Sequence, residues 1–391
     1  MIPVFRPSFD DEEWQALREP LENAWVTIGP KTKAFEEAFA AYVGAPHAVA
    51  LNSGTAALHL ALKALNVEGG EVITPSLTFV STSHTILYNS ATPVFADIEE
   101  DTLNISPREI ERLITPRTKA IMVVHYGGHA CDMDPILEMA RDGGIKVIED
   151  AAHACGSEYK GRKIGSISDA SCFSFHAVKN MTTGDGGMIT FHDPEIDQRL
   201  RNLRWMGLTG DTWARSSDGG DRYSWYYEAE EVGFKYYMND VAATLGLVQL
   251  RKLDRLNARR RQLTRHYDRC FAELDWVRTP VEKAYTRSSK HNYVVRVPDR
   301  DELISYLREH GVSASVHYVP NHFYHMYRHC KADLPVTERV WKEIVTLPLF
   351  PDMTESQVEQ VVDTVRAFGS RKGRARGKPT NEQREGTTRA A

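Results

Sequence analysis

The sequence SFHAVKNMTTGDGG, residues 174–187, indicates the fold class more strongly than any other segment of this 391-residue chain. It follows an apolar run, residues 170–173, which has the length and composition of a buried β-strand. Lys179 therefore comes just after a strand end, with Ser174 upstream and glycines downstream. An amine in this position can hold an aldehyde cofactor as a Schiff base if its neighbours lower its pKa. Because most lysines are solvated surface cations, the hypothesis depends on other residues.

Asp150 is the first candidate partner of Lys179. Residues 145–148 (IKVI) are typical of a buried strand, and Glu149 and Asp150 close it. In open α/β sheets, ligands bind beyond the carboxyl ends of the parallel strands, where both Asp150 and Lys179 are expected. Pyridoxal phosphate needs a carboxylate at its pyridinium nitrogen. Alternatively, Asp150 is only the N-cap of a helix that starts at Ala151.

A candidate phosphate site follows the strand-like residues 48–51. The turn NSGT, residues 52–55, leads into a helical segment, residues 56–62. Gly54 allows close backbone approach, and free N–H groups at a helix start attract an anion. The hydroxyl groups of Thr55 and Ser174 add possible donors. A plain helix cap explains the same turn, so the motif alone leaves both interpretations open.

Together these motifs resemble the DegT/DnrJ/EryC1/StrS family of sugar aminotransferases, which are pyridoxal-phosphate enzymes of the aspartate aminotransferase fold (fold type I). The similarity extends from Ile2 to about Phe368. Each landmark is weak by itself, whereas their order and spacing are highly specific. The landmarks are GP at 29–30, NSGTAAL at 52–58, residues 75–80, EDAAH at 149–153, residues 174–187 and HYVP at 317–320.

The resemblance implies roles for individual residues. Lys179 corresponds to the Schiff-base lysine, which also carries the proton to and from the substrate carbon. Asp150 corresponds to the partner of the pyridinium nitrogen. His153 occupies the position that contacts the phenolic oxygen of the cofactor, where many members have Gln. Phe79 corresponds to the aromatic residue that stacks on the pyridine ring. The residues that match the phosphate site are Gly54, Thr55 and Ser174.

One segment departs from the family pattern. The family usually has an Asn whose side chain reaches the cofactor phosphate of the neighbouring subunit. In GFKYYMND, residues 233–240, Lys235 replaces that Asn and Tyr237 replaces an Arg. A lysine can also bind a phosphate as a point charge. We therefore expect a homodimer with an isologous interface and shared active sites, in which Lys235 approaches the partner's cofactor.

The acceptor pocket is expected at HYVPNH, residues 317–322, where His317, Tyr318 and His322 match the family's substrate residues. Residues 222–227 are basic and rich in tyrosine and could contact a nucleotide diphosphate. The resemblance thus implies transfer of an amino group from L-glutamate to a nucleotide-activated keto-deoxysugar, with ping-pong kinetics. A 4-keto-6-deoxyhexose is favoured, and a 3-keto sugar is also compatible.

Three other functions stay in view. A related branch dehydrates sugars and has His in place of the lysine, so Lys179 argues against that branch. Another branch aminates keto-cyclitols in aminoglycoside pathways, and the sequence does not separate it from the sugar enzymes. A non-catalytic regulatory protein on the same fold would need neither Lys179 nor Asp150.

The net charge, the apolar content and the cysteines argue against several classes of protein. The net charge of −5 argues against a nucleic-acid partner, and no apolar run is long enough to cross a bilayer. The N-terminus lacks the apolar core of a signal peptide, and five scattered cysteines suit reduced thiols, so we expect a cytoplasmic protein. Histidines and cysteines gather near residues 125–134 and 322–330 without the spacing of a metal site, so no metal is predicted.

The order of segments predicts an α/β fold with a mainly parallel seven-stranded sheet in an α/β/α large domain. The expected divisions are a large domain with an N-terminal arm (1–245), a smaller C-terminal α+β domain (246–369) and a disordered basic tail (370–391). We also expect one arm helix at 10–24, a long functional loop at 207–232 and a long helix at 239–274. The seven expected strands are residues 48–51, 71–74, 93–97, 120–125, 145–148, 170–173 and 188–191.

Overall fold

The computed structural model describes residues 1–209, 227–330 and 332–375. Within them, the predicted seven strands form one sheet, and only β9 runs opposite to its neighbours. The predicted α/β fold class is therefore confirmed. In spatial order the strands are β1 (His47–Leu51), β9 (Gly187–Phe191), β8 (Ala170–Ser174), β5 (Lys146–Asp150), β4 (Thr118–Val124), β2 (Glu71–Pro75) and β3 (Thr92–Ala96).

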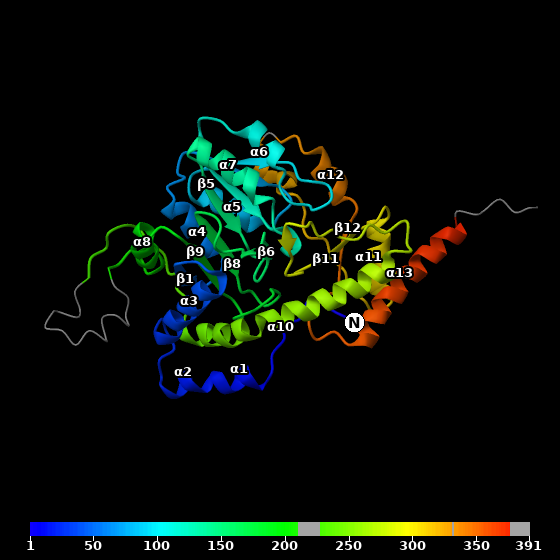
Figure 1. The fold of residues 1–391 in the computed structure, drawn as a ribbon, viewed down its shortest axis with the longest axis horizontal. Helices are drawn as coiled ribbons and strands as arrows, with labels where there is room; N and C mark the ends of the chain where they lie inside the picture. The colour runs from blue at the N-terminus through cyan, green and yellow to red at the C-terminus, as the bar shows by residue number, and fades with distance from the viewer. Residues whose placement is uncertain (210–226, 331, 376–391) are drawn as a thin grey trace, which may run out of the picture.

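Helices cover both faces of this sheet (Figure 1). Side chains alternate along each strand, so Ile121 and Val123 of β4 enter one apolar core and Met122 enters the other. This alternation gives the three-layer α/β/α arrangement. The core on one face is closed by α3 (Pro30–Val43), α6 (Pro107–Leu113) and α7 (Met133–Gly143), and the core on the other face by α4 (Gly54–Ala64), α5 (Val80–Tyr88) and α8 (Glu195–Arg204).

A 32-residue helix, α10 (Asp240–Phe271), crosses from the large sheet to a second apolar core (Figure 1). Leu253 packs in a core of the large sheet, whereas Tyr267 packs in this second core of the C-terminal region. The expected division after residue 245 thus falls inside a helix that both regions share. The second core also contains β11 (Tyr293–Arg296), β12 (Ile344–Leu347), α11 (Arg300–Glu309) and α13 (Glu355–Ala375).

Smaller elements join these two regions. A three-stranded sheet connects them because β10 pairs with β6. The ends of the expected long loop lie close together, since Leu208 bridges Ala229; residues 210–226 lie outside the described residues. The smaller elements are β6 (Glu158–Tyr159), β7 (Arg162–Lys163), β10 (Thr286–Arg287), α12 (Pro335–Trp341), η1 (Tyr126–Gly128), η2 (Asn321–Phe323) and η3 (His325–Tyr327).

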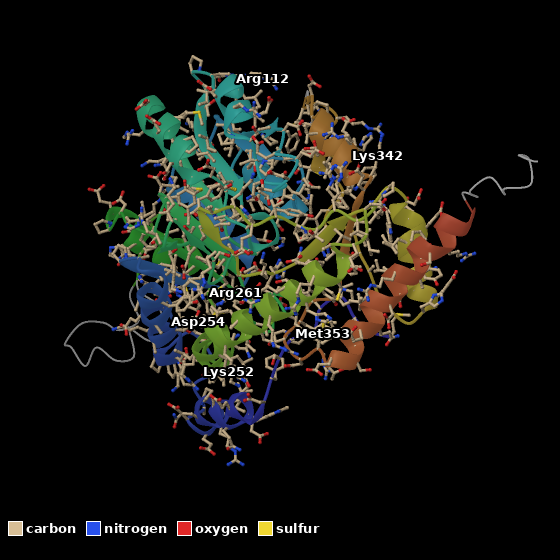
Figure 2. The ribbon with its side chains drawn as sticks, turned by 45° about the vertical axis from the view of Figure 1, so that its right-hand side comes forward. Arg112, Lys252, Asp254, Arg261, Lys342 and Met353 are labelled. Carbon is tan, nitrogen blue, oxygen red and sulfur yellow. The ribbon has the colours of Figure 1, made fainter. Side chains whose placement is uncertain are left out.

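The N-terminal arm differs from its prediction. It forms two helices, α1 (Asp11–Ala16) and α2 (Arg18–Glu22), instead of one. Pro20 has no N–H group to donate to the carbonyl of Ala16, which explains the break. The arm packs on α10, where the Lys252 ammonium donates to Glu13 at 2.9 Å (Figure 2).

The expected start of the tail at residue 370 also needs correction. Helix α13 continues to Ala375, six residues beyond the expected end of the C-terminal domain at residue 369. The guanidinium group of Arg371 lies 6.0 Å from the ring centre of Tyr306, which ties this last part of the helix to α11. Residues 376–391 lie outside the described residues.

Among the described residues, every helix is too short or too polar to span a bilayer.

Candidate active site

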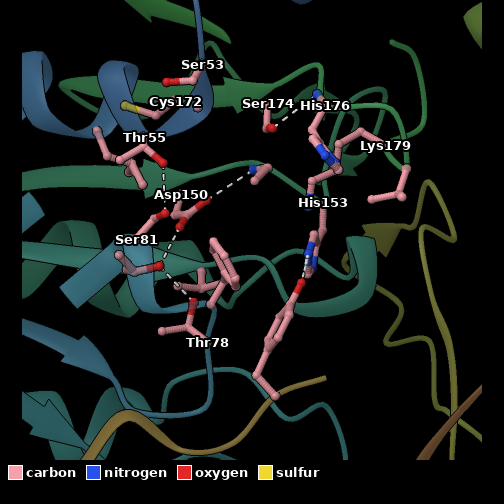
Figure 3. A pocket seen from close by; sticks show the side chains of 18 of the residues that line it. Ser53, Thr55, Thr78, Ser81, Asp150, His153, Cys172, Ser174, His176 and Lys179 are labelled. Atoms are coloured by element: carbon pink, nitrogen blue, oxygen red, sulfur yellow. Dashed lines mark hydrogen bonds between the residues drawn. The ribbon is translucent and has the colours of Figure 1, made fainter. Parts of the chain in front are cut away.

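The candidate site is a cavity of about 320 Å³ at the carboxyl ends of β5 and β8. Asp150 ends β5, and Lys179 follows β8 on the loop that leads to β9. Figure 3 shows these two residues around the same cavity as Thr55, His153 and Ser174. Parallel pairing of β5 with β8 brings the two strand ends together, as expected for a ligand site in an open α/β sheet.

Asp150 is buried at the floor of the cavity. Its Oδ2 accepts a hydrogen bond from the Thr82 hydroxyl at 2.7 Å, and its Oδ1 accepts one from the Ala152 N–H at 3.2 Å. Burial raises the pKa of Asp150, against the opposing effect of these hydrogen bonds. Residues 151–157 form turns, so Asp150 caps no helix. A buried carboxylate with these contacts suits a cationic nitrogen in the cavity.

Lys179 lies half-buried on the opposite wall. Its loop closes on itself because the Thr182 hydroxyl and the Thr183 N–H both donate to the Phe175 carbonyl, each at 3.0 Å. Desolvation lowers the pKa of Lys179 to about 8, although the Asp150 carboxylate acts in the opposite direction. The lowered pKa increases the uncharged fraction of the amine near neutral pH, and the uncharged amine is the form that attacks a carbonyl.

The turn before α4 exposes groups at the cavity that suit an anion. Ser53 caps the helix by accepting from the Ala56 N–H at 3.0 Å, and the helix start points at the cavity. The Thr55 hydroxyl lies 2.8 Å from the Ser81 hydroxyl of α5. A Cβ atom on Gly54 would lie 2.8 Å from the Ser174 Cβ, so only glycine lets the two segments meet. Three hydroxyl groups and a helix N-terminus fit a phosphate.

His153 and Tyr318 form the side of the cavity nearest the second core. His153 Nδ1 accepts from the Gly127 N–H at 3.3 Å, so its Nε2 carries the proton and donates to the Tyr318 hydroxyl at 2.9 Å. Burial lowers the pKa of His153 well below its usual value, which keeps the ring neutral. Phe79, 56% exposed, lies at the mouth with its ring centre 5.7 Å from that of Tyr318. A planar ring bound between these side chains would contact Phe79.

His317 also lines the cavity. Its Nδ1 lies 2.8 Å from the Thr346 hydroxyl of β12, and its carbonyl accepts a hydrogen bond from the Tyr126 hydroxyl. Burial lowers the pKa of His317 to about 4, with a further contribution from the Lys179 ammonium. The segment of His317 and Tyr318 thus brings the second apolar region to the cofactor cavity.

Two predicted site residues do not line the cavity. His322 Nδ1 lies 2.7 Å from the Ser76 hydroxyl, and its Nε2 lies 3.3 Å from a carboxylate oxygen of Glu338. Lys235 is exposed, and its ammonium lies 4.0 Å from the centre of the Trp205 ring. Of the possible nucleotide contacts at 222–227, residues 222–226 lie outside the described residues.

Sequence reasoning missed several cavity residues. Thr82 and Ser81 are in the first turn of α5, directly after Phe79. Hydroxyl residues in the first turn of a helix that follows a buried strand could have indicated them. His176 and Asp185 belong to the quoted segment 174–187 but received no role. Cys172 has no such signal, because it is one of the alternating apolar residues of β8.

The histidines and cysteines near residue 125 have structural partners. His125 Nε2 donates to the buried Glu149 carboxylate at 2.7 Å, and its Nδ1 accepts from the Cys131 N–H at 3.0 Å. His129 contacts the Asn104 side chain at 3.3 Å. In the described part of the chain, no three His, Cys, Asp or Glu side chains are grouped as metal ligands.

Comparisons with known proteins agree with this geometry. Residues 7–366 match the model of the DegT/DnrJ/EryC1/StrS aminotransferase family. The spore coat polysaccharide biosynthesis protein SpsC of Bacillus subtilis is 45% identical over 377 residues, which cover 93% of this chain and 96% of SpsC. The aminotransferase TlmJ of Streptoalloteichus hindustanus is 36% identical with a TM-score of 0.89, covering 96% of this chain and all of TlmJ.

A third relative is the putative sugar aminotransferase Spr1654 of Streptococcus pneumoniae in its pyridoxal-phosphate form. It is 33% identical with a TM-score of 0.87, and the match covers 95% of this chain and 99% of that chain. The buried carboxylate, the amine and the phosphate surface fit the same cofactor here. The chain therefore belongs to the DegT/DnrJ/EryC1/StrS aminotransferase family and is a pyridoxal 5′-phosphate-dependent aminotransferase of fold type I.

Proposed function

We propose that the protein transfers the amino group of L-glutamate to the keto group of a nucleotide-activated deoxysugar, a 4-keto-6-deoxyhexose. One observation carries the proposal: Lys179, Asp150 and the hydroxyl-lined start of α4 meet in one cavity that His317 and Tyr318 close from the opposite side. The name of SpsC, a polysaccharide biosynthesis protein, supports a sugar acceptor.

The residues of this chain have separate tasks in the proposed reaction. The bound cofactor supplies an electron sink for the carbanion at the substrate carbon. Asp150 would hold a proton on the ring nitrogen of the bound cofactor, because its carboxylate is buried and suits a cationic partner. Lys179 Nζ would accept and return the proton of the substrate carbon, for which a pKa of about 8 is suitable near neutral pH.

The two substrates use the same cavity in turn. His317 and Tyr318 are neutral, and we propose that they donate hydrogen bonds to the sugar hydroxyl groups. His322 does not line the cavity. We propose that it contributes indirectly, because its hydrogen bonds to Ser76 hold the segment that also contains His317 and Tyr318. Glutamate must leave as 2-oxoglutarate before the sugar enters, which predicts ping-pong kinetics.

We also propose a homodimer with shared active sites. In the cavity, Lys179 is the only Lys or Arg among the lining residues that the structure describes. A cofactor phosphate and a nucleotide diphosphate together need further cationic groups. Lys235 is exposed on the segment next to the α4 turn, where the Asn52 N–H donates to the Tyr236 carbonyl at 2.7 Å. We propose that Lys235 in this position contacts the cofactor phosphate of the partner subunit. The five free cysteines support a reducing, cytoplasmic setting.

Borohydride reduction tests the cofactor attachment. We expect reduction of the protein with pyridoxal 5′-phosphate to leave a covalent adduct on Lys179, because its amine is the one facing the cavity. Peptide mass mapping locates the adduct. Lys179→Ala should lose both adduct and turnover, and an adduct on another lysine would refute the assignment.

A substrate screen tests the acceptor. Glutamate is supplied with nucleotide-linked 4-keto and 3-keto sugars and with a keto-cyclitol, and release of 2-oxoglutarate and the aminated product are measured. We expect turnover with a 4-keto-6-deoxyhexose. Turnover with the cyclitol alone would instead place the protein in the cyclitol-aminating branch.

A further inference from the structure

Arg260 is a buried cation on α10 without a carboxylate partner. It is 4% exposed, and none of the described residues places a carboxylate oxygen within 4.0 Å of its guanidinium group, the ion-pair limit. Its Nε has no hydrogen-bond partner among them. Burial lowers the pKa of Arg260 to about 10, so the group is still charged at neutral pH. An unpaired buried charge is destabilising, so the groups that do contact Arg260 indicate what it is placed to hold.

The contacts of Arg260 lead to the catalytic loop. Its Nη1 donates to the carbonyl of Asn180 at 3.3 Å and lies 3.5 Å from Asn257 Oδ1. Asn180 is the residue after Lys179. Its side-chain amide donates to Asn257 Oδ1 at 2.7 Å and to the Ser289 carbonyl at 3.0 Å. Arg260 therefore holds the main chain directly beside the lysine.

The same network reaches His153. Asn180 Oδ1 accepts a hydrogen bond from His291 Nδ1 at 2.9 Å. The His291 ring lies 4.3 Å from the His153 ring, centre to centre, with 32° between their planes. The Ser289 hydroxyl also donates to the His153 carbonyl at 2.9 Å. Asn180 is thus the junction between the lysine loop and the wall that His153 forms.

Several charged or titratable groups surround this network. The Asp150 carboxylate affects the pKa of Lys179. The Lys179 ammonium in turn lowers the pKa values of three histidines, His153, His291 and His317. Those coupled to Arg260 are Asp352, Cys155 and His291. Asp150 is the carboxylate on the lysine side, and the three histidines are kept neutral by burial. Arg260 is not among the groups whose charge acts on Lys179, so it acts on the lysine through the main chain of Asn180.

We propose that Arg260 is a positioning residue that, through Asn180, fixes the main chain of Lys179 and so keeps its amine aimed into the cavity. This inference rests on the proposed role of Lys179. It adds a residue that is outside the cavity, on a helix that both apolar cores share. Arg261, the next residue along α10, is labelled in Figure 2 and marks the place.

The test compares Arg260→Met with Arg265→Met, an exposed arginine on the same helix. Lys179 of the cofactor-free protein is acetylated with acetic anhydride over a range of pH, and its labelling rate is read by mass spectrometry. We expect Arg260→Met to lower the rate by about threefold or more across the pH range, because the Lys179 amine is no longer held toward the cavity. Its melting temperature should be unchanged or higher, because apolar replacement of a buried charge is often stabilising. Arg265→Met should match the wild type in both measurements.

The wild-type labelling profile in Arg260→Met would overturn the inference. If that variant does not fold, Arg260→Leu, which also removes the donor to the Asn180 carbonyl, is judged by the same criterion. Borohydride trapping separates the two hypotheses. A wild-type protein without an adduct on Lys179 refutes the proposed function, whereas adduct formation at equal rates in the wild type and Arg260→Met refutes only the role of Arg260.

Discussion

At the scale of single residues, the environment of Asp150 decides what its carboxylate can do. The side chain is buried, and Thr82 and the Ala152 N–H orient both oxygens. Asp150→Asn keeps this shape but removes the negative charge that holds the ring-nitrogen proton. We expect turnover to fall roughly a hundredfold or more, a loss of about 2.7 kcal/mol in transition-state stabilisation. Cofactor binding and turnover are measured separately.

The control for this variant is Asp142→Asn on the surface of α7. It removes the same charge far from the cavity, so its turnover should equal that of the wild type. Full activity in Asp150→Asn would mean that the carboxylate does not serve the cofactor ring.

At the scale of elements, the start of α4 and the first turn of α5 act together. Thr55 and Ser81 bring one hydroxyl group from each helix to within 2.8 Å. Thr55→Val removes one donor but keeps the side-chain volume. We expect the dissociation constant for pyridoxal 5′-phosphate to rise about tenfold, which corresponds to one lost hydrogen bond to a charged group. Equilibrium titration of the cofactor-free protein measures it.

Pyridoxal, which lacks the phosphate, is the matched ligand for this test. Its affinity should be the same in Thr55→Val and the wild type, because the ring and the aldehyde keep their contacts. An equal loss for both ligands would show that Thr55 supports the helix start itself and not the phosphate.

At the scale of the whole molecule, the proposed dimer predicts complementation between subunits. Lys179→Ala and Lys235→Ala chains are each expected to be impaired alone. In a mixed dimer, one cavity combines an intact Lys179 with an intact Lys235 of the partner. We therefore expect mixing after dissociation to restore up to about a quarter of wild-type activity, from one good site in the half of the dimers that are mixed. Activity is compared before and after mixing.

Two outcomes would contradict this prediction. If Lys235 serves the cavity of its own chain, mixed dimers contain no site that the parents lack, and mixing restores nothing. If sedimentation under assay conditions shows an active monomer, the shared site itself is refuted.

The sequence by itself determined the layers and the positions of Lys179 and Asp150, the proposed catalytic pair. Apolar runs of four to six residues predict each of the seven strands, because burial between two helix layers leaves a local pattern. Lys179 and Asp150 were predictable because each follows such a strand. The phosphate surface at Gly54 was predictable for the same reason, since strand, turn and helix start are adjacent in sequence.

Only the tertiary structure decided which distant residues meet. His153 donates to Tyr318 across 165 positions, and Arg260 bonds the Asn180 carbonyl across 80. The spacing of apolar residues in the sequence does not predict such pairs, because they depend on how α10 and the second core pack on the sheet. The same packing leaves His322 between Ser76 and Glu338, outside the cavity where its motif predicted it. Motifs carry local geometry, whereas the position of one element against another follows from the burial of the whole chain.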